Sequence, residues 1–370
     1  MSDGQIIRTT RNGRLDSALR VLALGVTLYA FLVSISMLGA SFKLFGGGIV
    51  PGIIQSASNP LVGLLVGILA TTLVQSSSTT TSIVVVLVGS GAMPVSTAIP
   101  VVMGANIGTS VTNTLVSLGH VTRTSEYARA VAASTVHDFF NISAVVILFP
   151  LQVTTNLLGR AAESLANVFY DIGGLTFTSP LKALTAPAVE TVSSLVGGRG
   201  WLLLILALVV MFVSLRYLVV IMKSLVMGRV EAVFDVVLFK NPARAFVVGL
   251  ILTVIVQSSS VTTSLVVPLA GAGLLALRQI FPYTLGANVG TTITAMLASL
   301  AVGEVSAVTV AFAHLLFNVA GIAVIWTVRK IPMEMARRFG EIARRQRWIP
   351  VIYVVTAFYV LPFLLILMLR

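Results

Sequence analysis

The sequence Gln-Ser-Ser-Ser at residues 75–78 interrupts an apolar stretch and recurs unchanged at residues 257–260. Further along, the run Gly-Ala-Asn-Ile-Gly-Thr at residues 104–109 recurs as Gly-Ala-Asn-Val-Gly-Thr at residues 286–291. Both pairs of motifs are separated by the same 182 positions. A shared offset between motifs in the same order indicates that one structural unit occurs twice in the chain.

The composition is that of a membrane protein. Of the 370 residues, 57% are hydrophobic and 10% are charged, and the mean hydropathy is +1.02. An ordinary soluble domain has about 25% charged residues, because its surface must face water. This composition excludes a soluble enzyme, a disordered chain and a fibre. Helix-length apolar stretches and 30 glycines favour an all-α polytopic membrane protein over a β-barrel.

The chain has no cysteine, so disulfides, thiolate metal sites and cysteine nucleophiles are excluded. Its three histidines are too few and too scattered to predict a metal centre. We expect His137 and His314 to tie helices together beside Asn141 and Asn318, and we interpret Asp138 as structural. The net charge of +12 is interpreted as the bias of inner loops rather than as a nucleic-acid site.

Four elements are predicted in each copy of the repeated unit. A spanning helix is followed by a stretch split by Gln-Ser-Ser-Ser, a stretch split by the Gly-Ala-Asn motif, and a second spanning helix. Residues 61–74 and 79–90, on either side of the first serines, are each too short for a span of about 20 residues. We therefore expect a re-entrant hairpin there. Glycines and an asparagine at residues 104–109 predict a broken transmembrane helix.

Three crossings in each copy would invert the second copy relative to the first. Basic residues test this expectation, because they concentrate in cytoplasmic loops. With the N-terminus inside, 18 basic residues fall in inner segments and five in outer segments, while Arg216 falls within a helix. The sequence therefore predicts two inverted-topology repeats in the cell inner (plasma) membrane, with a cytoplasmic N-terminus.

This topology divides the chain into six segments. They are a cytoplasmic N-terminus (1–18), the first repeat (19–150), an extracellular linker (151–200), the inverted second repeat (201–331), a basic cytoplasmic surface helix (332–347) and a final transmembrane helix (348–370). The surface helix is inferred from its dense arginines, which suit the headgroup region of a bilayer.

Uncharged polar residues gather at the breaks of both copies. Residues 61–119 contain no Lys, Arg, Asp or Glu, and residues 245–300 contain only Arg278. Hydroxyls, amides and freed N–H groups suit a small oxyanion, while freed carbonyls suit sodium. With no side-chain charge to balance either ion, each ion would neutralise the other. Such a pair is worth about 4 kcal/mol at a separation of about 4 Å and an effective dielectric of about 20. The composition of the breaks therefore favours cotransport.

These motifs resemble those of the type II sodium–phosphate cotransporter family. The resemblance rests on both Gln-Ser-Ser-Ser motifs, on residues 103–114 and on residues 135–141, and it covers about residues 20–330. It implies a secondary active transporter that takes up inorganic phosphate by alternating access. Na⁺ would be the coupling ion, and no other cofactor is implied.

The resemblance also implies that both Gln-Ser-Ser-Ser motifs lie at the phosphate site and that Thr291 and Thr294 bind sodium. The glutamines and asparagines at the same breaks are added to these ligands as our own inference. The expected phosphate ligands are Ser76, Ser77, Ser78, Ser258, Ser259, Ser260, Asn106 and Asn288. The expected sodium ligands are Gln75, Gln257, Thr291, Thr294, Thr109 and Thr112. The last two threonines are inferred only because they occupy the positions equivalent to Thr291 and Thr294 in the first copy.

Several alternatives stay open at this point. The chain could be a sodium-coupled carrier of another oxyanion, a phosphate exporter or, as a different class, an anion channel. A channel needs a continuous polar path, whereas paired hairpins and broken helices favour a closed site. An enzyme is not predicted, because no Ser-His-Asp or Ser-Lys arrangement is evident. The lipid bilayer is an expected partner, nucleic acid is not, and a homodimer is left open.

Overall fold

The computed structural model describes residues 13–44, 59–172, 180–233 and 241–369, and within these ranges all regular structure is helical. Seven helical segments there are long and apolar enough to cross a bilayer: Leu19–Phe42, Val95–His120, Thr124–Thr155, Gly200–Leu218, Leu277–Val302, Val305–Thr327 and Ile349–Leu369. The chain is therefore a multi-pass α-helical membrane protein, as predicted. Residues 1–12 of the expected cytoplasmic N-terminus (1–18) lie outside the described residues.

The helices alternate between long spans and shorter segments. In chain order they are α1 (Gly13–Leu44), α3 (Pro60–Val74), α4 (Ser77–Gly89), α5 (Val95–Gly108), α6 (Val111–Ser117), α7 (Thr124–Thr155), α8 (Leu157–Ile172), α9 (Pro180–Leu195), α10 (Gly200–Val233), α11 (Pro242–Val256), α12 (Ser259–Ser264), α13 (Val266–Gly271), α14 (Leu277–Val302), α15 (Val305–Thr327), α16 (Lys330–Arg345), α17 (Ile349–Val354) and α18 (Leu361–Leu369). A π-helical segment, Val355–Val360, joins α17 to α18.

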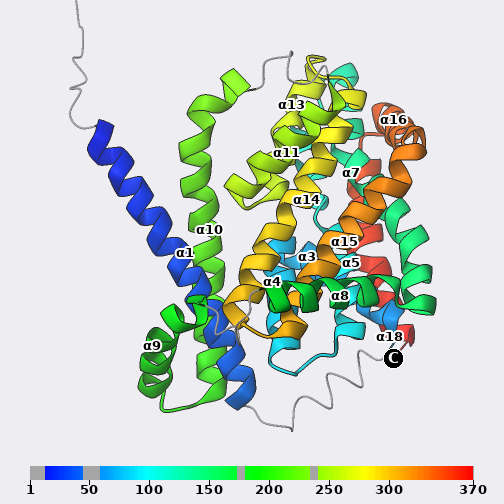
Figure 1. The fold of residues 1–370 in the computed structure, drawn as a ribbon. Coiled ribbons are helices and arrows are strands. Elements are labelled where there is room, and N and C mark those ends of the chain that lie inside the picture. Colours follow the sequence, from blue (N-terminus) through cyan, green and yellow to red (C-terminus); the bar gives the residue numbers. More distant parts are fainter. Residues whose placement is uncertain (1–12, 45–58, 173–179, 234–240, 370) are drawn as a thin grey trace, which may run out of the picture.

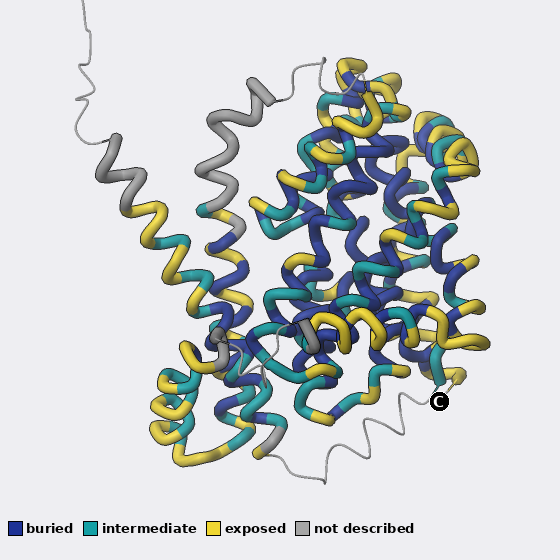
Figure 2. The backbone as a smooth tube through the Cα atoms, viewed as in Figure 1, coloured by how far each residue is buried: buried dark blue, intermediate teal, exposed yellow. Residues whose placement is uncertain are grey.

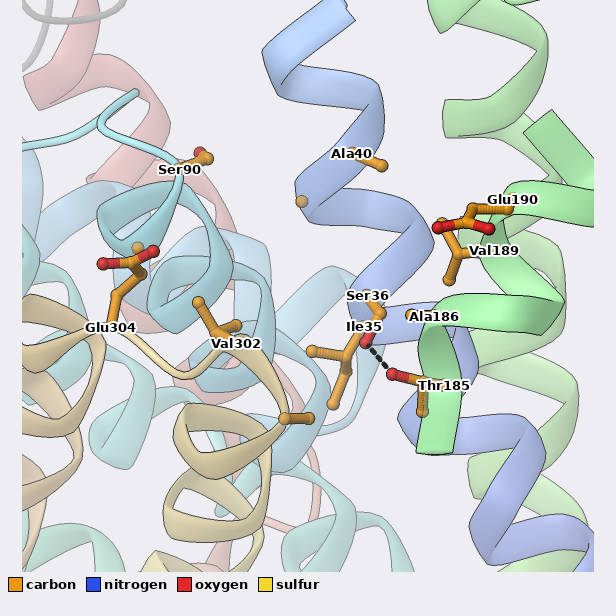
Figure 3. A pocket seen from close by; sticks show the side chains of 13 residues that line it. Ile35, Ser36, Ala40, Ser90, Thr185, Ala186, Val189, Glu190, Val302 and Glu304 are labelled. Carbon is orange, nitrogen blue, oxygen red and sulfur yellow. Dashed lines mark hydrogen bonds between the residues drawn. The ribbon is translucent and has the colours of Figure 1, made fainter. Parts of the chain in front are cut away.

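The helices form two groups (Figure 1). Helices α1 and α10 lie side by side with α9 at one end, and the remaining helices form a larger bundle next to them. Ile35 of α1 and Met211 of α10 share one buried apolar cluster with Val85 of α4 and Ala298 of α14. Much of the remaining surface of α1 and α10 is exposed and apolar (Figure 2), as contact with lipid requires.

Glycines bring α3 and α5 into backbone contact. A Cβ atom at Gly104 would lie 1.9 Å from the carbonyl oxygen of Leu64, and one at Gly67 would lie 2.0 Å from that of Val101. Any side chain at these positions would overlap the neighbouring helix. The two glycines therefore allow the close helix–helix packing that is common inside membranes.

The same contact recurs between α11 and α14. A Cβ atom at Gly286 would lie 1.9 Å from the carbonyl oxygen of Phe246, and one at Gly249 would lie 2.0 Å from that of Tyr283. These four positions are those of the first copy shifted by 182 residues. The second copy therefore repeats the helix packing of the first.

The predicted helix breaks differ from those in the structure. In the first copy the helix continues through Gly104, ends at Gly108 and resumes at Val111. In the second copy α14 runs unbroken through residues 286–291 to Val302. The predicted broken helix is thus shifted in the first copy and wrong in the second. The physical reason is that these glycines serve close packing with α3 and α11 and do not unwind the helix.

Residues 151–200, predicted as a linker, contain the end of α7 and the helices α8 and α9. Helix α8 packs against α15, and α16 packs against α7. Both α8 and α16 are amphipathic. Helix α8 follows α7, the last long helix of the first copy, and α16 follows α15, the last long helix of the second copy. Each of them therefore lies against the last long helix of the other copy. A Cβ atom at Gly340 of α16 would lie 2.3 Å from the carbonyl oxygen of Ala128. The similarity of the two copies therefore continues beyond residue 150.

Candidate functional site

The two Gln-Ser-Ser-Ser motifs form matching turns between helices. Gln75 ends α3 with a left-handed backbone (φ 58°), and Gln257 ends α11 in the same way (φ 57°). Ser76 and Ser258 are extended (φ −152° and −151°) and cap the following helices, accepting from the N–H groups three residues ahead. A left-handed non-glycine residue costs about 1–2 kcal/mol. Both turns therefore need compensating contacts.

The glutamine side chains supply these contacts. The Nε2 of Gln75 donates to the Thr72 carbonyl, and its Oε1 accepts a 2.8 Å hydrogen bond from the Thr112 hydroxyl. Gln257 accepts a 2.7 Å hydrogen bond from the Thr294 hydroxyl in the same way. The structure thus joins each predicted sodium-ligand glutamine to one of the predicted threonines. Each turn is held against the helix that follows its hairpin.

The other two predicted threonines are arranged differently. Thr109 and Thr291 donate to carbonyl oxygens one turn earlier in their own helices, at 3.0 Å and 3.1 Å. Both side chains are buried. Ser260 donates a long hydrogen bond of 3.5 Å to the Thr109 carbonyl, which brings the second serine motif next to the break in the first copy. Thr109 therefore lies close to the second turn, and neither Thr109 nor Thr291 bonds to a glutamine.

Both turns line a single cavity of about 270 Å³. One wall carries polar groups from the two motifs, namely Gln75, Ser76, Ser78, Thr79, Gln257 and Ser258. Helix α10 contributes Phe212, Leu215, Arg216 and Val220 to the lining of the cavity. The structure therefore brings the two motifs together, although they are 182 residues apart in sequence. Ser77, Ser259 and Ser260 lie beside this wall, in the buried first turns of α4 and α12.

Arg216 is the one charged residue that lines this cavity among the described residues. Its presence corrects the sequence-based inference that no side-chain charge faces the site. An exposed guanidinium next to neutral hydroxyls and amides favours an anion. The signal was present in the sequence, because an arginine inside an apolar helix usually marks a functional position.

A crossed pair of histidine–asparagine contacts lies deeper in the bundle. His137 Nε2 lies 2.5 Å from Asn288 Oδ1, and His314 Nε2 lies 3.4 Å from Asn106 Oδ1. Both histidines donate, since an amide oxygen only accepts. Each histidine thus bonds to the asparagine of the other copy. The sequence predicted that these histidines tie helices together beside Asn141 and Asn318, but it did not predict the bonds to Asn288 and Asn106, because it carried no information on which helices meet.

Asn106 and Asn288 were expected to contact phosphate, but the structure places them in this network. Asn288 also donates to Asn141 at 2.8 Å, and Asn141 donates to the Asn106 carbonyl at 3.0 Å. Asn106 and Asn288 are almost fully buried, and neither is among the residues that line the cavity between the turns. In this structure they join the copies instead of facing the cavity.

Asp138 is more central than the sequence suggested. It lies near the middle of α7 and is completely buried, and neither carboxylate oxygen has a hydrogen-bond partner among the described residues. The hydroxyls of Ser110 and Tyr353 face it without reaching hydrogen-bond geometry. A buried charge without a partner is strongly destabilising. This carboxylate therefore favours either a bound proton or a nearby cation.

The fold and site define a polytopic membrane protein with a polar cavity lined by two matching turns. The sequence model described as Na⁺/Pi-cotransporter matches residues 30–178 and 210–338. The chain belongs to this family.

Individual relatives agree with the family match. Sodium-dependent phosphate transport protein 2A of Rattus norvegicus is 35% identical over 415 residues, covering 90% of this chain and 65% of the relative. Protein 2B of Homo sapiens is 33% identical over 441 residues, covering 92% of this chain and 64% of the relative. The chain thus spans a little under two thirds of the length of these relatives. No solved structure matches the chain.

Proposed function

We propose that the protein is a secondary active transporter that couples uptake of inorganic phosphate to sodium by alternating access. The observation that carries this proposal is the cavity shared by the two Gln-Ser-Ser-Ser turns, with Arg216 in its lining. Hydroxyls, amides and one cation form a small polar site for an oxyanion. The names of the relatives, sodium-dependent phosphate transport proteins, support the choice of ions.

In this proposal the chain consists of two inverted repeats, each with a re-entrant hairpin. Helices α3 and α4 contain 15 and 13 residues and would extend about 20 Å, whereas a bilayer core is about 30 Å thick. In Figure 1 α3 and α4 lie in the lower half of the bundle, and α11 and α13 lie in its upper half. The distribution of basic residues supports a cytoplasmic N-terminus and an extracellular α8–α9 region.

In this proposed topology the chain keeps the six segments that were named from the sequence. The first repeat (19–150) and the second (201–331) would carry the transport machinery. The 151–200 segment would lie outside the cell, and residues 332–347 would form the cytoplasmic surface helix before the final span (348–370). The protein would reside in the inner (plasma) membrane.

The serines of the two turns are the proposed phosphate ligands, acting with the N–H groups of the helix starts and with Arg216. The proposed sodium ligands are Gln75, Gln257 and the threonines bonded to them, Thr112 and Thr294. Thr109, which lies beside Ser260, and Thr291, its equivalent in the second copy, complete the proposed set. We give Asn106 and Asn288 a positioning role, because their side chains bond to histidines.

Radiolabelled phosphate uptake by the full chain in proteoliposomes tests this function. We expect uptake against a phosphate gradient when sodium is high outside, and none when potassium replaces sodium. Excess unlabelled phosphate should compete, whereas sulfate should not. Competition by sulfate would instead indicate a carrier of another oxyanion. Uptake that never exceeds equilibrium would favour a channel, and sodium-independent export would contradict the proposal.

A further inference from the structure

A second cavity, of about 420 Å³, lies at the other end of α14 from Val302. It is lined by Pro242, Arg278, Gln279, Phe281, Pro282, Trp326, Arg329 and Met333. These residues come from the starts of α11, α14 and α16 and from the end of α15. In the proposed topology this end of the bundle faces the cytoplasm, so the present inference rests on the proposed function for its orientation.

The charge of this cavity is purely positive. Arg278 and Arg329 are both exposed, and none of the eight residues that line the cavity is acidic. The nearest acidic residue in sequence, Glu334, is already paired: it accepts hydrogen bonds of 2.7 Å from Arg337 and 2.8 Å from Arg338. Glu334 is therefore not available to neutralise the two cavity arginines.

One of these arginines is held in place. The guanidinium carbon of Arg329 lies 4.7 Å from the centre of the Trp326 ring, and its Nη1 donates to the Trp326 carbonyl at 3.4 Å. Stacking on an indole fixes the plane of a guanidinium while leaving its other N–H donors available. A second arginine in the same cavity adds donors for a compact, multiply charged oxyanion.

We propose that Arg278 and Arg329 bind a phosphate group in this inner cavity. Two kinds of molecule carry such a phosphate group, and the arginines would bind the phosphate of either one. One is inorganic phosphate that has left the central site, since Arg278 lies on the same helix as Thr294, which bonds to Gln257 of the central cavity, about 24 Å away. The other is the headgroup of an anionic phospholipid, because the walls are largely apolar and basic cavities near the cytoplasmic surface suit such lipids.

The first arm of the test measures binding of radiolabelled inorganic phosphate to delipidated protein in detergent with potassium as the only cation. Omitting sodium isolates the inner cavity, because the proposed central site requires sodium. We expect weak phosphate binding to wild type that falls about tenfold in Arg278→Gln/Arg329→Gln, as loss of charge-assisted contacts predicts. Arg278→Lys/Arg329→Lys keeps the charges and should recover part of the binding. Arg345→Gln, an exposed arginine outside the cavity, is the matched control.

The second arm replaces phosphate with lipid. Wild type and the same variants are reconstituted in nanodiscs with equal amounts of phosphatidylglycerol and phosphatidylcholine, and retained lipid is quantified by native mass spectrometry. Selective loss of phosphatidylglycerol in the double Gln variant identifies the lipid as the source. Loss of sodium-free phosphate binding alone identifies the free ion. Losses in both arms also support the proposal, because they show that both sources are accepted.

Unchanged binding in both arms, for a double variant that elutes as wild type on size exclusion, would overturn the inference. That result leaves sodium-driven uptake by wild type untouched, so the proposed function would stand. Conversely, a failure of sodium-driven uptake with arginine-dependent binding intact would reject the function and keep the phosphate site.

Discussion

The turns of the two copies are built alike, whereas the helices behind them are not. Gln75 and Gln257 share the same left-handed backbone, and each accepts a threonine hydroxyl at nearly the same distance, 2.8 Å and 2.7 Å. Behind the turns, Asp138 of α7 corresponds to Leu315 of α15. Asn141 bonds to the other copy, while the equivalent Asn318 donates to its own helix at 3.0 Å.

This difference shows which parts of the two copies are subject to the same structural constraint. Both turns line one cavity, so the proposed ligand would meet the same groups on both of them. The helices behind them face different neighbours and have diverged in charge and hydrogen bonding. Matched substitutions in the two copies should therefore have equal effects at the turns and in the glycine contacts, and unequal effects behind them.

The largest effect is expected where the backbones touch. Gly104→Ala and Gly286→Ala each place a Cβ atom 1.9 Å from a carbonyl oxygen. Each should destabilise the protein by about 3 kcal/mol through overpacking. Thermal unfolding in detergent, followed by tryptophan fluorescence, should show similar losses for both. Gly25→Ala is the control, because a Cβ atom there meets nothing within 4 Å. A normal unfolding midpoint for either glycine variant would break the equivalence of the two contacts.

The next effect concerns the serines of the turns. Loss of a hydroxyl bonded to a charged ligand costs about 1.5–3 kcal/mol. Ser77→Ala and Ser259→Ala should therefore each raise the apparent phosphate constant about tenfold, measured as uptake at saturating sodium. The Ser164→Ala variant, an exposed serine on α8, should behave as wild type. Normal uptake by the Ser77→Ala/Ser259→Ala double variant, at normal expression, would remove the serines from the site.

An unequal effect is expected for the two asparagines behind the turns. Asn141→Ala removes contacts with Asn288 and Asn106, leaving buried groups of both without partners, and should cost about 2 kcal/mol. Asn318→Ala removes a bond within one helix and should cost about 1 kcal/mol or less. The difference between their unfolding midpoints measures the asymmetry. Equal shifts would show that both copies are tied with the same strength.

Arg216 extends the comparison, because it lines the same cavity as both turns but belongs to a third helix, α10. Arg216→Gln should raise the apparent phosphate constant about fivefold, a modest factor because the guanidinium is exposed and screened. The effect should shrink at high ionic strength. Arg199→Gln, just before the start of the same helix, is the control. If both variants have the same apparent phosphate constant as wild type at every ionic strength, the charge of Arg216 does not contribute to phosphate binding.

The smallest effect is expected at the threonines. Thr294→Val replaces the hydroxyl bonded to Gln257 with a methyl group and should weaken sodium dependence about threefold, as loss of a neutral hydrogen bond predicts. Thr112→Val should do the same in the first copy. Sodium activation curves at fixed phosphate give the values. A shift of the phosphate curve alone would move these residues from the sodium site to the phosphate site.

The sequence by itself determined the membrane class, the duplication and the position of both turns. These follow from local properties: apolar runs of helix length, a repeated motif, and a glutamine followed by a capping serine. The same local signals misplaced the helix breaks. A glycine that unwinds a helix and a glycine that packs against a neighbouring backbone look identical in sequence, and only the presence of Leu64 or Phe246 opposite distinguishes them.

The tertiary structure alone decided how the site is assembled. It placed Arg216 in the lining of the cavity that both turns share, buried Asp138 without a partner, and joined His137 and His314 to the asparagines of opposite copies. These contacts join residues that lie far apart along the chain. No pattern within one segment specifies which distant helix will pack against it, because that choice depends on the shapes and polar groups of all the helices together.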